Sequence, residues 1–279
     1  MKKLGLTLLA FILLFVGFLL VKTFTFTSRQ LQVDLVEKVI IPDSAIERLQ
    51  KALRIKTISF ETEEDFDSTQ FEVFNQFLKN QYPSIDSLLD HKVFSKYSHL
   101  YKWQGSNSQL KPIVLMGHID VVPIASPDKW SVDPFSGEIK DGKIWGRGTI
   151  DDKFSVIGIL EAVEMLLKYN FQPERTIYLS FGHDEEVGGE RGAVLIADYL
   201  KNQGVEAEFV LDEGYAITQK LIPGMEPDVA MIGIAEKGSA TIEFTVDMEG
   251  GHSSQPAKET AIDVLANAIS QLKANPLEA

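Results

Sequence analysis

Cysteine is absent from the 279 residues of this sequence. A disulfide scaffold, a thiolate metal site and a cysteine nucleophile are therefore excluded, and any bound metal needs histidine and carboxylate ligands. Basic residues are also scarce, because 27 Lys and Arg stand against 40 Asp and Glu, giving a net charge of −13. This balance argues against nucleic acid as a partner, since nucleic-acid binding requires basic patches.

A long uncharged run occurs at the N-terminus. It extends from Leu4 to Val21, after Lys2 and Lys3 and before Lys22. As a helix rising about 1.5 Å per residue, it can cross a hydrocarbon core of about 30 Å, and the lysine pair favours an N-terminus on the inside. No small-x-small cleavage site follows. We expect residues 1–22 to be an uncleaved membrane anchor with the rest of the chain on the non-cytoplasmic side; a cleaved signal peptide on a secreted protein is the alternative.

After a tether at residues 23–42, strands alternate with helices. Helices are expected from Asp43 and around Phe71, the second ending before Pro83, and further strands and helices are predicted at 112–116, 153–169, 176–181, 192–203 and 209–211. This alternation predicts an α/β fold over residues 43–235, a three-layer sandwich around a mixed, mostly parallel central sheet.

The pattern changes near residue 236. Residues 240–248 alternate between apolar and polar side chains, which predicts a half-exposed strand, and residues 260–272 have the spacing of an amphipathic helix. A single strand and a single helix cannot bury a core of their own. We therefore expect residues 236–279 to be the incomplete start of an inserted α+β domain.

Four polar clusters either follow a predicted strand or begin a predicted helix. They are His118-Ile119-Asp120, Asp151-Asp152, Asp184-Glu185-Glu186 and Asp212-Glu213. Each alone is explained as a helix cap or a solvated turn. Together they predict a metal centre, because strand ends are where α/β sheets place ligands and gathered carboxylates repel unless cations neutralise them. Residues two apart on an extended chain face the same side, so Asp120 is suited to orient His118.

Three segments resemble the co-catalytic zinc exopeptidase family, which includes aminoacylase, carboxypeptidase S and carnosinase. They are His118-Ile119-Asp120, Gly148-Thr149-Ile150-Asp151-Asp152-Lys153 and Asp184-Glu185-Glu186-Val187-Gly188-Gly189. The branch of carboxypeptidase S and N-fatty-acyl-amino-acid synthase/hydrolase is the most similar. That likeness extends to Leu211-Asp212-Glu213-Gly214, Glu236-Lys237-Gly238-Ser239 and Gly251-His252-Ser253-Ser254. The resemblance covers roughly residues 40 to 279 and implies the sandwich fold with an inserted lid or dimerisation domain.

The resemblance implies a centre with two Zn²⁺ ions. His118 binds one ion, Glu186 binds the other, and Asp151 bridges both, next to a peptide bond to the following aspartate that is usually cis. Asp212 or Glu213 completes the site of the His118 ion. Members of the family differ over which of these two acids is used, so both stay candidates.

The resemblance also implies catalytic roles and a substrate. Glu185 is the general base, Asp120 steers the metal-binding histidine, and His252 reaches across a homodimer, formed through the lid domain, to stabilise the oxyanion. The implied reaction is hydrolysis of the amide bond of an N-acyl amino acid or of a C-terminal peptide bond. Dipeptidase or aminopeptidase activity is the alternative.

One departure from the family concerns its last zinc ligand, a late histidine, since no histidine follows His252. We therefore expect a C-terminally truncated member whose activity belongs to a longer protein, or else a catalytically incomplete, membrane-tethered fragment. His183 matches no ligand position and is expected to be structural. His91 and His99 lie among lysines and are expected at the surface.

Overall fold

The computed structural model describes residues 2–27, 39–214, 216–238, 241–252, 254 and 257–276. Most of the predicted tether, together with Ser239, Ala240 and Ser253 from the predicted strand and motifs, lies outside the described residues. The chain divides into two units, Met1–Val210 and Leu211–Ala279.

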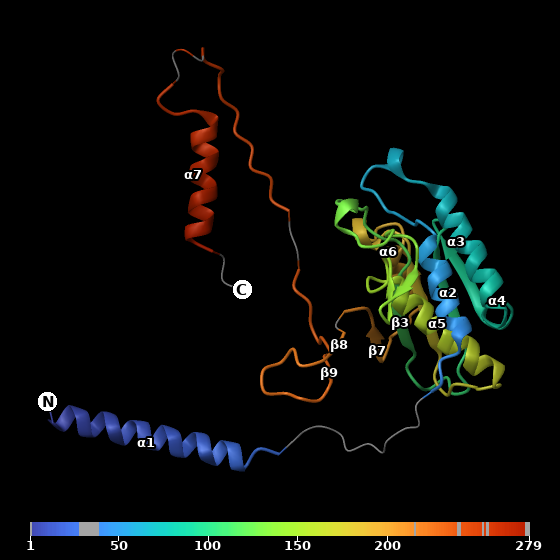
Figure 1. The fold of residues 1–279 in the computed structure, drawn as a ribbon, viewed down its shortest axis with the longest axis horizontal. Helices are drawn as coiled ribbons and strands as arrows, with labels where there is room; N and C mark the ends of the chain where they lie inside the picture. Colours follow the sequence, from blue (N-terminus) through green and yellow to red (C-terminus); the bar gives the residue numbers. More distant parts are fainter. Residues whose placement is uncertain are drawn as a thin grey trace. The chain divides into compact units, whose positions relative to one another are not determined.

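The predicted N-terminal helix is present as α1, Lys2–Phe24 (Figure 1). Its described side chains are all exposed, and the span Gly5–Phe24 is long and apolar enough to cross a membrane. A helix that is apolar all round needs an apolar environment on every side. The helix therefore has the properties of a membrane anchor or of a signal sequence.

A five-stranded mixed sheet forms the centre of the globular part, with strand order β1-β2-β6-β3-β7. The strands are β1 Asp90–Phe94, β2 Ser98–Trp103, β3 Ile113–His118, β6 Ile177–Gly182 and β7 Phe209–Leu211. Strands β3 and β6 are parallel, whereas β2 is antiparallel to both β1 and β6. The α/β class and the mixed sheet are confirmed, and the antiparallel strands β1 and β2 are an addition to the prediction.

Strands β1 and β2 were not predicted from the sequence, because polar residues interrupt their hydrophobic pattern. Most of β1 is exposed, whereas β2 is buried despite Ser98 and His99. The expectation that His99 lies at the surface is therefore wrong, since its side chain is 3% exposed and its Nε2 lies 2.8 Å from Asn75 Oδ1. Burial lowers the pKa of His99 to about 3, so the ring is neutral. His91 is exposed, as expected.

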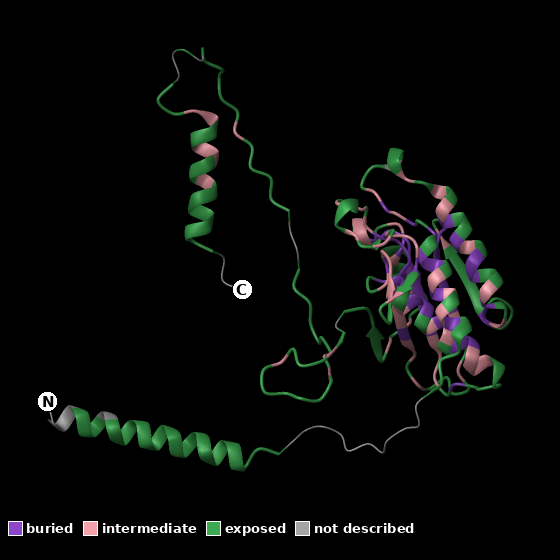
Figure 2. Ribbon diagram, viewed as in Figure 1, coloured by how far each residue is buried: buried purple, intermediate pink, exposed green. Residues whose placement is uncertain are grey.

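Helices cover both faces of the sheet, which makes the predicted three layers. On one face lie α2 Asp43–Arg54, α3 Ser68–Gln81, α4 Pro83–Leu88 and α5 Lys153–Lys168; on the other lies α6 Ala193–Asn202. Successive strand residues point to opposite faces. Leu179 accordingly packs in the larger core with α5, and its neighbour Tyr178 packs in the smaller core with Ile196 of α6. Figure 2 shows the buried residues on the helix faces that meet the sheet.

The segment between β3 and α5 contains a short hairpin. Its strands are β4 Glu138–Lys140 and β5 Lys143–Trp145, paired antiparallel. Asp141 and Gly142 between them have φ of 53° and 70°. Two positive φ values in a two-residue loop are typical of a type I′ turn, which favours Asp-Gly.

The second unit contains the short antiparallel strands β8 Ile217–Thr218 and β9 Val229–Ala230 and the helix α7 Ala261–Ala274. The predicted helix is confirmed, and a capping box between Thr260 and Asp263 begins it. The predicted strand is wrong over its described part, because residues 241–248 carry no strand. A strand needs a neighbour for its backbone hydrogen bonds, and these residues have none among those that the structure describes. No described side chain of this unit is buried.

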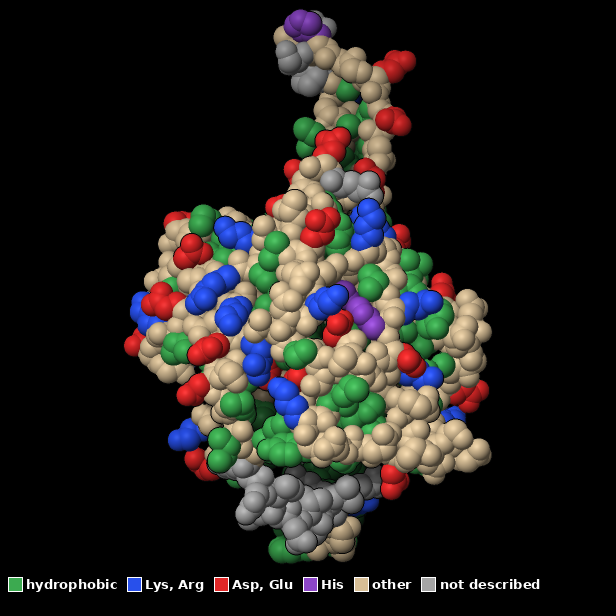
Figure 3. All heavy atoms as spheres, turned by 90° about the vertical axis from the view of Figure 1, so that its right-hand side faces the viewer, with side chains coloured by type: hydrophobic (Ala, Val, Ile, Leu, Met, Phe, Trp, Pro, Cys, Tyr) green, Lys and Arg blue, Asp and Glu red, His purple; other side chains and the backbone are tan. Residues whose placement is uncertain are grey.

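Charged side chains of both signs are interspersed on the face of the molecule drawn in Figure 3. The acidic excess of the sequence is therefore not gathered into a single acidic field on that face. Surface charge of mixed sign keeps a protein surface hydrated, but it does not indicate a particular binding partner.

A buried carboxylate joins helix α5 to helix α4. Glu164 is 2% exposed and accepts hydrogen bonds from the Ser84 hydroxyl at 2.8 Å and from the backbone N–H groups of Ser84 and Ile85 at 3.1 Å. These N–H groups belong to the first turn of α4, where no intrahelical acceptor exists. Glu164 thus fixes α5 laterally, and the opposite end of α5 begins at the candidate site.

Replacing Glu164 with alanine should lower the free energy of unfolding by about 2–4 kcal/mol, because the first-turn donors of α4 lose their charged acceptor. Urea unfolding followed by near-ultraviolet circular dichroism measures this change. Glu47→Ala, at an exposed position of α2, is the matched control and should change stability by no more than about 0.5 kcal/mol. Equal effects of the two variants would contradict the role of Glu164.

Candidate metal centre

The parallel pairing of β3 and β6 brings two of the predicted clusters to one edge of the sheet. His118, the last residue of β3, is paired with Gly182, the last residue of β6. The segments that follow these strands therefore leave the sheet side by side. They are Ile119-Asp120 on one strand and His183 to Glu186 on the other, as the sequence predicted.

Helix α5 supplies the third cluster at its N-terminus. Asp151 and Asp152 directly precede the helix, and the peptide bond between them is cis, as the resemblance implies. Helix α5 approaches β3 closely at Gly117, where a Cβ atom would lie 2.6 Å from Asp152 Oδ2. The glycine before His118 therefore lets the two aspartates lie next to the end of the strand.

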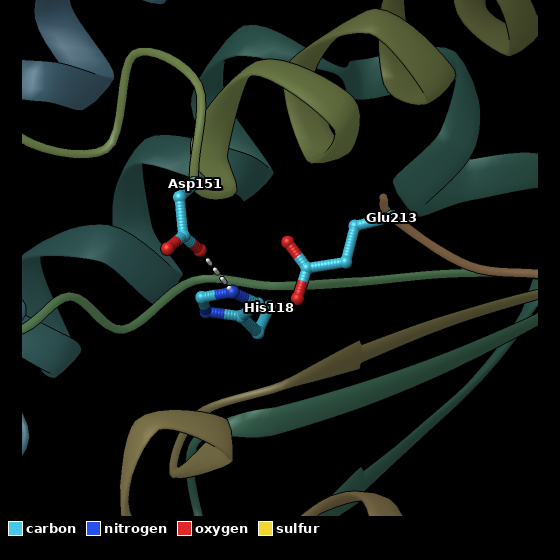
Figure 4. Close-up of side chains that lie close together, drawn as sticks. All are labelled: His118, Asp151 and Glu213. Carbon is cyan, nitrogen blue, oxygen red and sulfur yellow. Dashed lines mark hydrogen bonds and ion pairs between the residues drawn. The ribbon is translucent and has the colours of Figure 1, made fainter. Parts of the chain in front are cut away.

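The His118 imidazole lies between the clusters. Its Nε2 is 2.9 Å from Asp151 Oδ1 and 3.7 Å from Glu185 Oε2. Its Nδ1 is 3.1 Å from the backbone oxygen of Asp120 and 3.3 Å from that residue's Oδ1. Figure 4 shows the Asp151 carboxylate directed at the ring. Because Nδ1 is directed at Asp120, Nε2 is the nitrogen that faces the carboxylates of Asp151 and Glu185.

The Asp120 carboxylate is fully buried and acts as a hub for the site. Its Oδ1 accepts the Glu185 N–H at 3.2 Å, and its Oδ2 accepts the Glu186 N–H at 3.1 Å and the Ser59 hydroxyl at 2.7 Å. Burial alone favours the neutral form, but the hydrogen bonds from His118, Ser59 and Glu186 outweigh it and lower the pKa of Asp120. The hub is therefore an ionised carboxylate with its oxygens already occupied.

The pKa values of two other acids, Glu186 and Asp152, are shifted upwards instead. Burial raises the pKa of Glu186, and the nearby Asp151, Asp120 and Glu185 raise it further. Burial also raises the pKa of Asp152 to about 6, although its Oδ2 accepts the His118 backbone N–H at 3.2 Å. Burial is the largest cause of both shifts, so the protein's own donors do not fully stabilise these two carboxylates as anions.

These side chains fit a metal ion. One imidazole nitrogen and several carboxylate oxygens form a donor set that suits Zn²⁺ and other divalent cations. His118 and Asp151 each direct one ligand atom at the same space, and the buried Asp152 Oδ1 has no hydrogen-bond partner among the residues that the structure describes. A cation would offset both the burial and the repulsion that raise the pKa of Glu186.

The backbone conformation of the acidic turn after β6 explains the two glycines that follow it. Glu185–Val187 forms one turn of 3-10 helix, and Gly188 and Gly189 then have φ of 103° and 70°. Glycine adopts such values at no steric cost. Asp184 points into the protein, since its Oδ2 accepts the Arg191 N–H at 2.7 Å. The turn therefore presents Glu185 and Glu186 and keeps Asp184 as an anchor.

The remaining predicted site residues belong to the second unit. Asp212 and Glu213 directly follow β7 and are exposed, and the Glu213 N–H donates to Asp212 Oδ1 at 3.0 Å. Glu213 is also drawn in Figure 4. His252 is exposed, with its Nδ1 2.8 Å from Ser254 Oγ. These three residues stay predicted members of the site.

The expectation that His183 is structural agrees with its surroundings. Its ring is 2% exposed, and Nδ1 lies 2.6 Å from Ser98 Oγ. Sequence reasoning missed Ser59, which contacts Asp120 from 61 positions earlier in the chain. It also missed the role of Lys153, whose buried Nζ donates to the backbone oxygens of Ala52 and Ile55. No pattern in the sequence marks either contact, since both depend on the fold.

Comparisons with known proteins identify the family of this chain. Residues 114–278, more than half of the chain, match the model of peptidase family M20/M25/M40. The N-fatty-acyl-amino acid synthase/hydrolase of Xenopus tropicalis is 44% identical over 98% of this chain and 56% of its own length. A probable carboxypeptidase S-like protein of Dictyostelium discoideum is 46% identical over 92% of this chain and 52% of its own length.

The fold also matches solved structures. Human carnosine dipeptidase 1 superposes with a TM-score of 0.52 at 20% identity, over 63% of this chain and 40% of that chain. The chain spans about half the length of the curated relatives described above. On the match to the family model and the identity to these relatives, the chain belongs to peptidase family M20/M25/M40.

Proposed function

We propose that this chain is part of a zinc-dependent hydrolase that cleaves the amide bond of N-acyl amino acids or C-terminal peptide bonds. The observation that carries the proposal is the His118 imidazole, whose Nε2 faces Asp151 and Glu185 while Asp120 lies at its Nδ1. The names of the relatives support the substrate class, because one is an N-fatty-acyl-amino acid synthase/hydrolase and the other a carboxypeptidase S-like protein.

The proposed centre holds two Zn²⁺ ions. His118 would bind one, Glu186 the other, and Asp151 both. Asp212 or Glu213 is proposed to complete the His118 site. The resemblance supports this, because the segment Leu211-Asp212-Glu213-Gly214 matches the family in sequence.

Bound zinc supplies Lewis-acid polarisation of the substrate carbonyl and acidifies the attacking water. The chain's own contribution is proton transfer: Glu185 takes the proton of the water at a carboxylate oxygen and passes it to the leaving amine. The Glu185 side chain is about half exposed, at 51%, so a substrate can reach it. Asp120 keeps the His118 ring in place throughout. His252 from a second copy of the chain is proposed to stabilise the oxyanion.

Glu185→Gln in the full-length protein should lower kcat on N-acyl amino acids at least about a hundredfold, because the amide cannot accept the proton. Steady-state kinetics measures this, and Glu190→Gln, at an exposed position five residues after Glu185, is the control. Activity retained within about tenfold would remove Glu185 from the role of base.

The same assay discriminates between substrate classes when it includes dipeptides with a free amine beside amine-blocked N-acyl amino acids. Cleavage of the blocked substrates is expected. Cleavage of only the free-amine dipeptides would favour the alternative, a dipeptidase or aminopeptidase of the same family.

The ligand assignment predicts a different zinc content for each variant. Elemental analysis after dialysis should find two ions in the wild-type protein, one in His118→Gln and in Glu186→Gln, and none in Asp151→Asn, because the bridging acid serves both ions. Of Asp212→Asn and Glu213→Gln, only the variant of the true ligand should lose an ion. One ion or none in the wild-type protein would contradict the two-metal centre and favour a catalytically incomplete protein.

We further propose that α1 is an uncleaved signal anchor that leaves the catalytic part on the non-cytoplasmic side. The length of the apolar span and Lys2 and Lys3 before it support this orientation. In microsomes, the protein should stay with the membrane after a carbonate wash and resist protease until detergent is added. A variant without residues 1–24 is the control. Release of a shortened protein by carbonate would instead indicate a cleaved signal peptide and a secreted product.

A further inference from the structure

The Asp120 hub depends on a hydroxyl from a distant part of the chain. Ser59 is 3% exposed, and its Oγ donates to Asp120 Oδ2 at 2.7 Å. The same oxygen accepts the Glu186 N–H, and the other oxygen accepts the Glu185 N–H. One carboxylate therefore fixes the ring of His118 and the backbone of the acidic turn, and Ser59 fixes that carboxylate.

The backbone holds Ser59 in this position. Residues 57–59 lie against residues 119–121 as a parallel bridge: the Val121 N–H donates to the Thr57 oxygen at 3.0 Å, and the Ser59 N–H donates to the Val121 oxygen at 3.2 Å. The bridge already fixes the Ser59 backbone. The hydrogen bond from its hydroxyl to Asp120 therefore costs no further backbone conformational entropy.

The end of α2, directly before this segment, contacts the other side of the site. Lys153, directly after Asp151-Asp152, is fully buried, and its Nζ donates to the Ile55 oxygen at 2.5 Å and to the Ala52 oxygen at 3.1 Å. Residues 52–59 thus contact both the carboxylate that orients His118 and the helix start that carries the bridging aspartate.

From these contacts we infer that Ser59 is a positioning residue for the metal centre, acting through Asp120 on His118, Glu185 and Glu186. Its hydroxyl is one of the three donors that hold the Asp120 carboxylate in a single orientation. Without it, Asp120 Oδ2 keeps the Glu186 N–H and loses its shortest hydrogen bond. The inference rests on the proposed zinc centre and adds a residue to it that contacts no ligand atom.

Ser59→Ala in the full-length protein should weaken zinc binding about tenfold, the lower end of the effect seen when a partner of a metal ligand is removed. Competition with a chelating dye measures the affinity. Thr57→Val is the matched control, since its hydroxyl is equally buried but donates to the backbone oxygen of Ile119 at 2.5 Å. Its zinc affinity should stay within about twofold of wild type, although its melting temperature without metal falls as in Ser59→Ala.

Ser59→Thr, which keeps the hydroxyl, should restore the affinity to within about threefold of wild type. Unchanged zinc affinity in Ser59→Ala, or an equal loss in Thr57→Val, would overturn the role of Ser59, because the effect would then be absent or merely structural. A wild-type protein that binds no zinc would instead overturn the proposed function itself, and with it the basis for a positioning role.

Discussion

The parallel register between β3 and β6 is the constraint on which the rest of the site depends. Because His118 pairs with Gly182, the chain leaves both strands at one level, and the segments carrying Asp120 and Glu185 start as neighbours. A shift by one residue would turn every side chain of a strand to the opposite face. The two hydrophobic cores oppose that shift, since Leu179 and Tyr178 are each buried on their own face.

The acids at this edge divide into two kinds according to the donors that reach them. Asp120 receives a hydroxyl and two backbone N–H groups and faces the His118 ring, so it is stable as an anion without a metal. Glu186 has acidic neighbours, and its pKa is raised by burial and by their charge. An anion whose lone pairs are occupied is poorly suited to bind a cation. The division therefore separates the residue that orients from the residues available as ligands.

Much of this arrangement is predictable from sequence, because it depends on local signals. Apolar runs ending in His118 and Gly182 mark buried strands, and the periodic apolar positions after Asp152 mark α5. Polar residues at the ends of such elements collect at one edge in any α/β sheet. The antiparallel strands β1 and β2 were missed because their burial is decided by tertiary partners, as with His99, whose ring is buried next to Asn75.

The part that sequence reasoning could not reach is the support behind the ligands. Ser59 lies in a short segment without hydrophobic periodicity. Its contact with Asp120 forms only because a parallel bridge brings this segment next to residues 61 or more positions away in the sequence. Lys153 matches a family motif, yet its sequence neighbours give no hint that its ammonium group ends on the carbonyl oxygens of Ala52 and Ile55. The Lys153 contacts form only when helix α2 packs on α5, and that packing is set by apolar surface rather than by the polar atoms that it brings together. The orientation of the candidate ligands is therefore a consequence of core packing some distance from the metal centre.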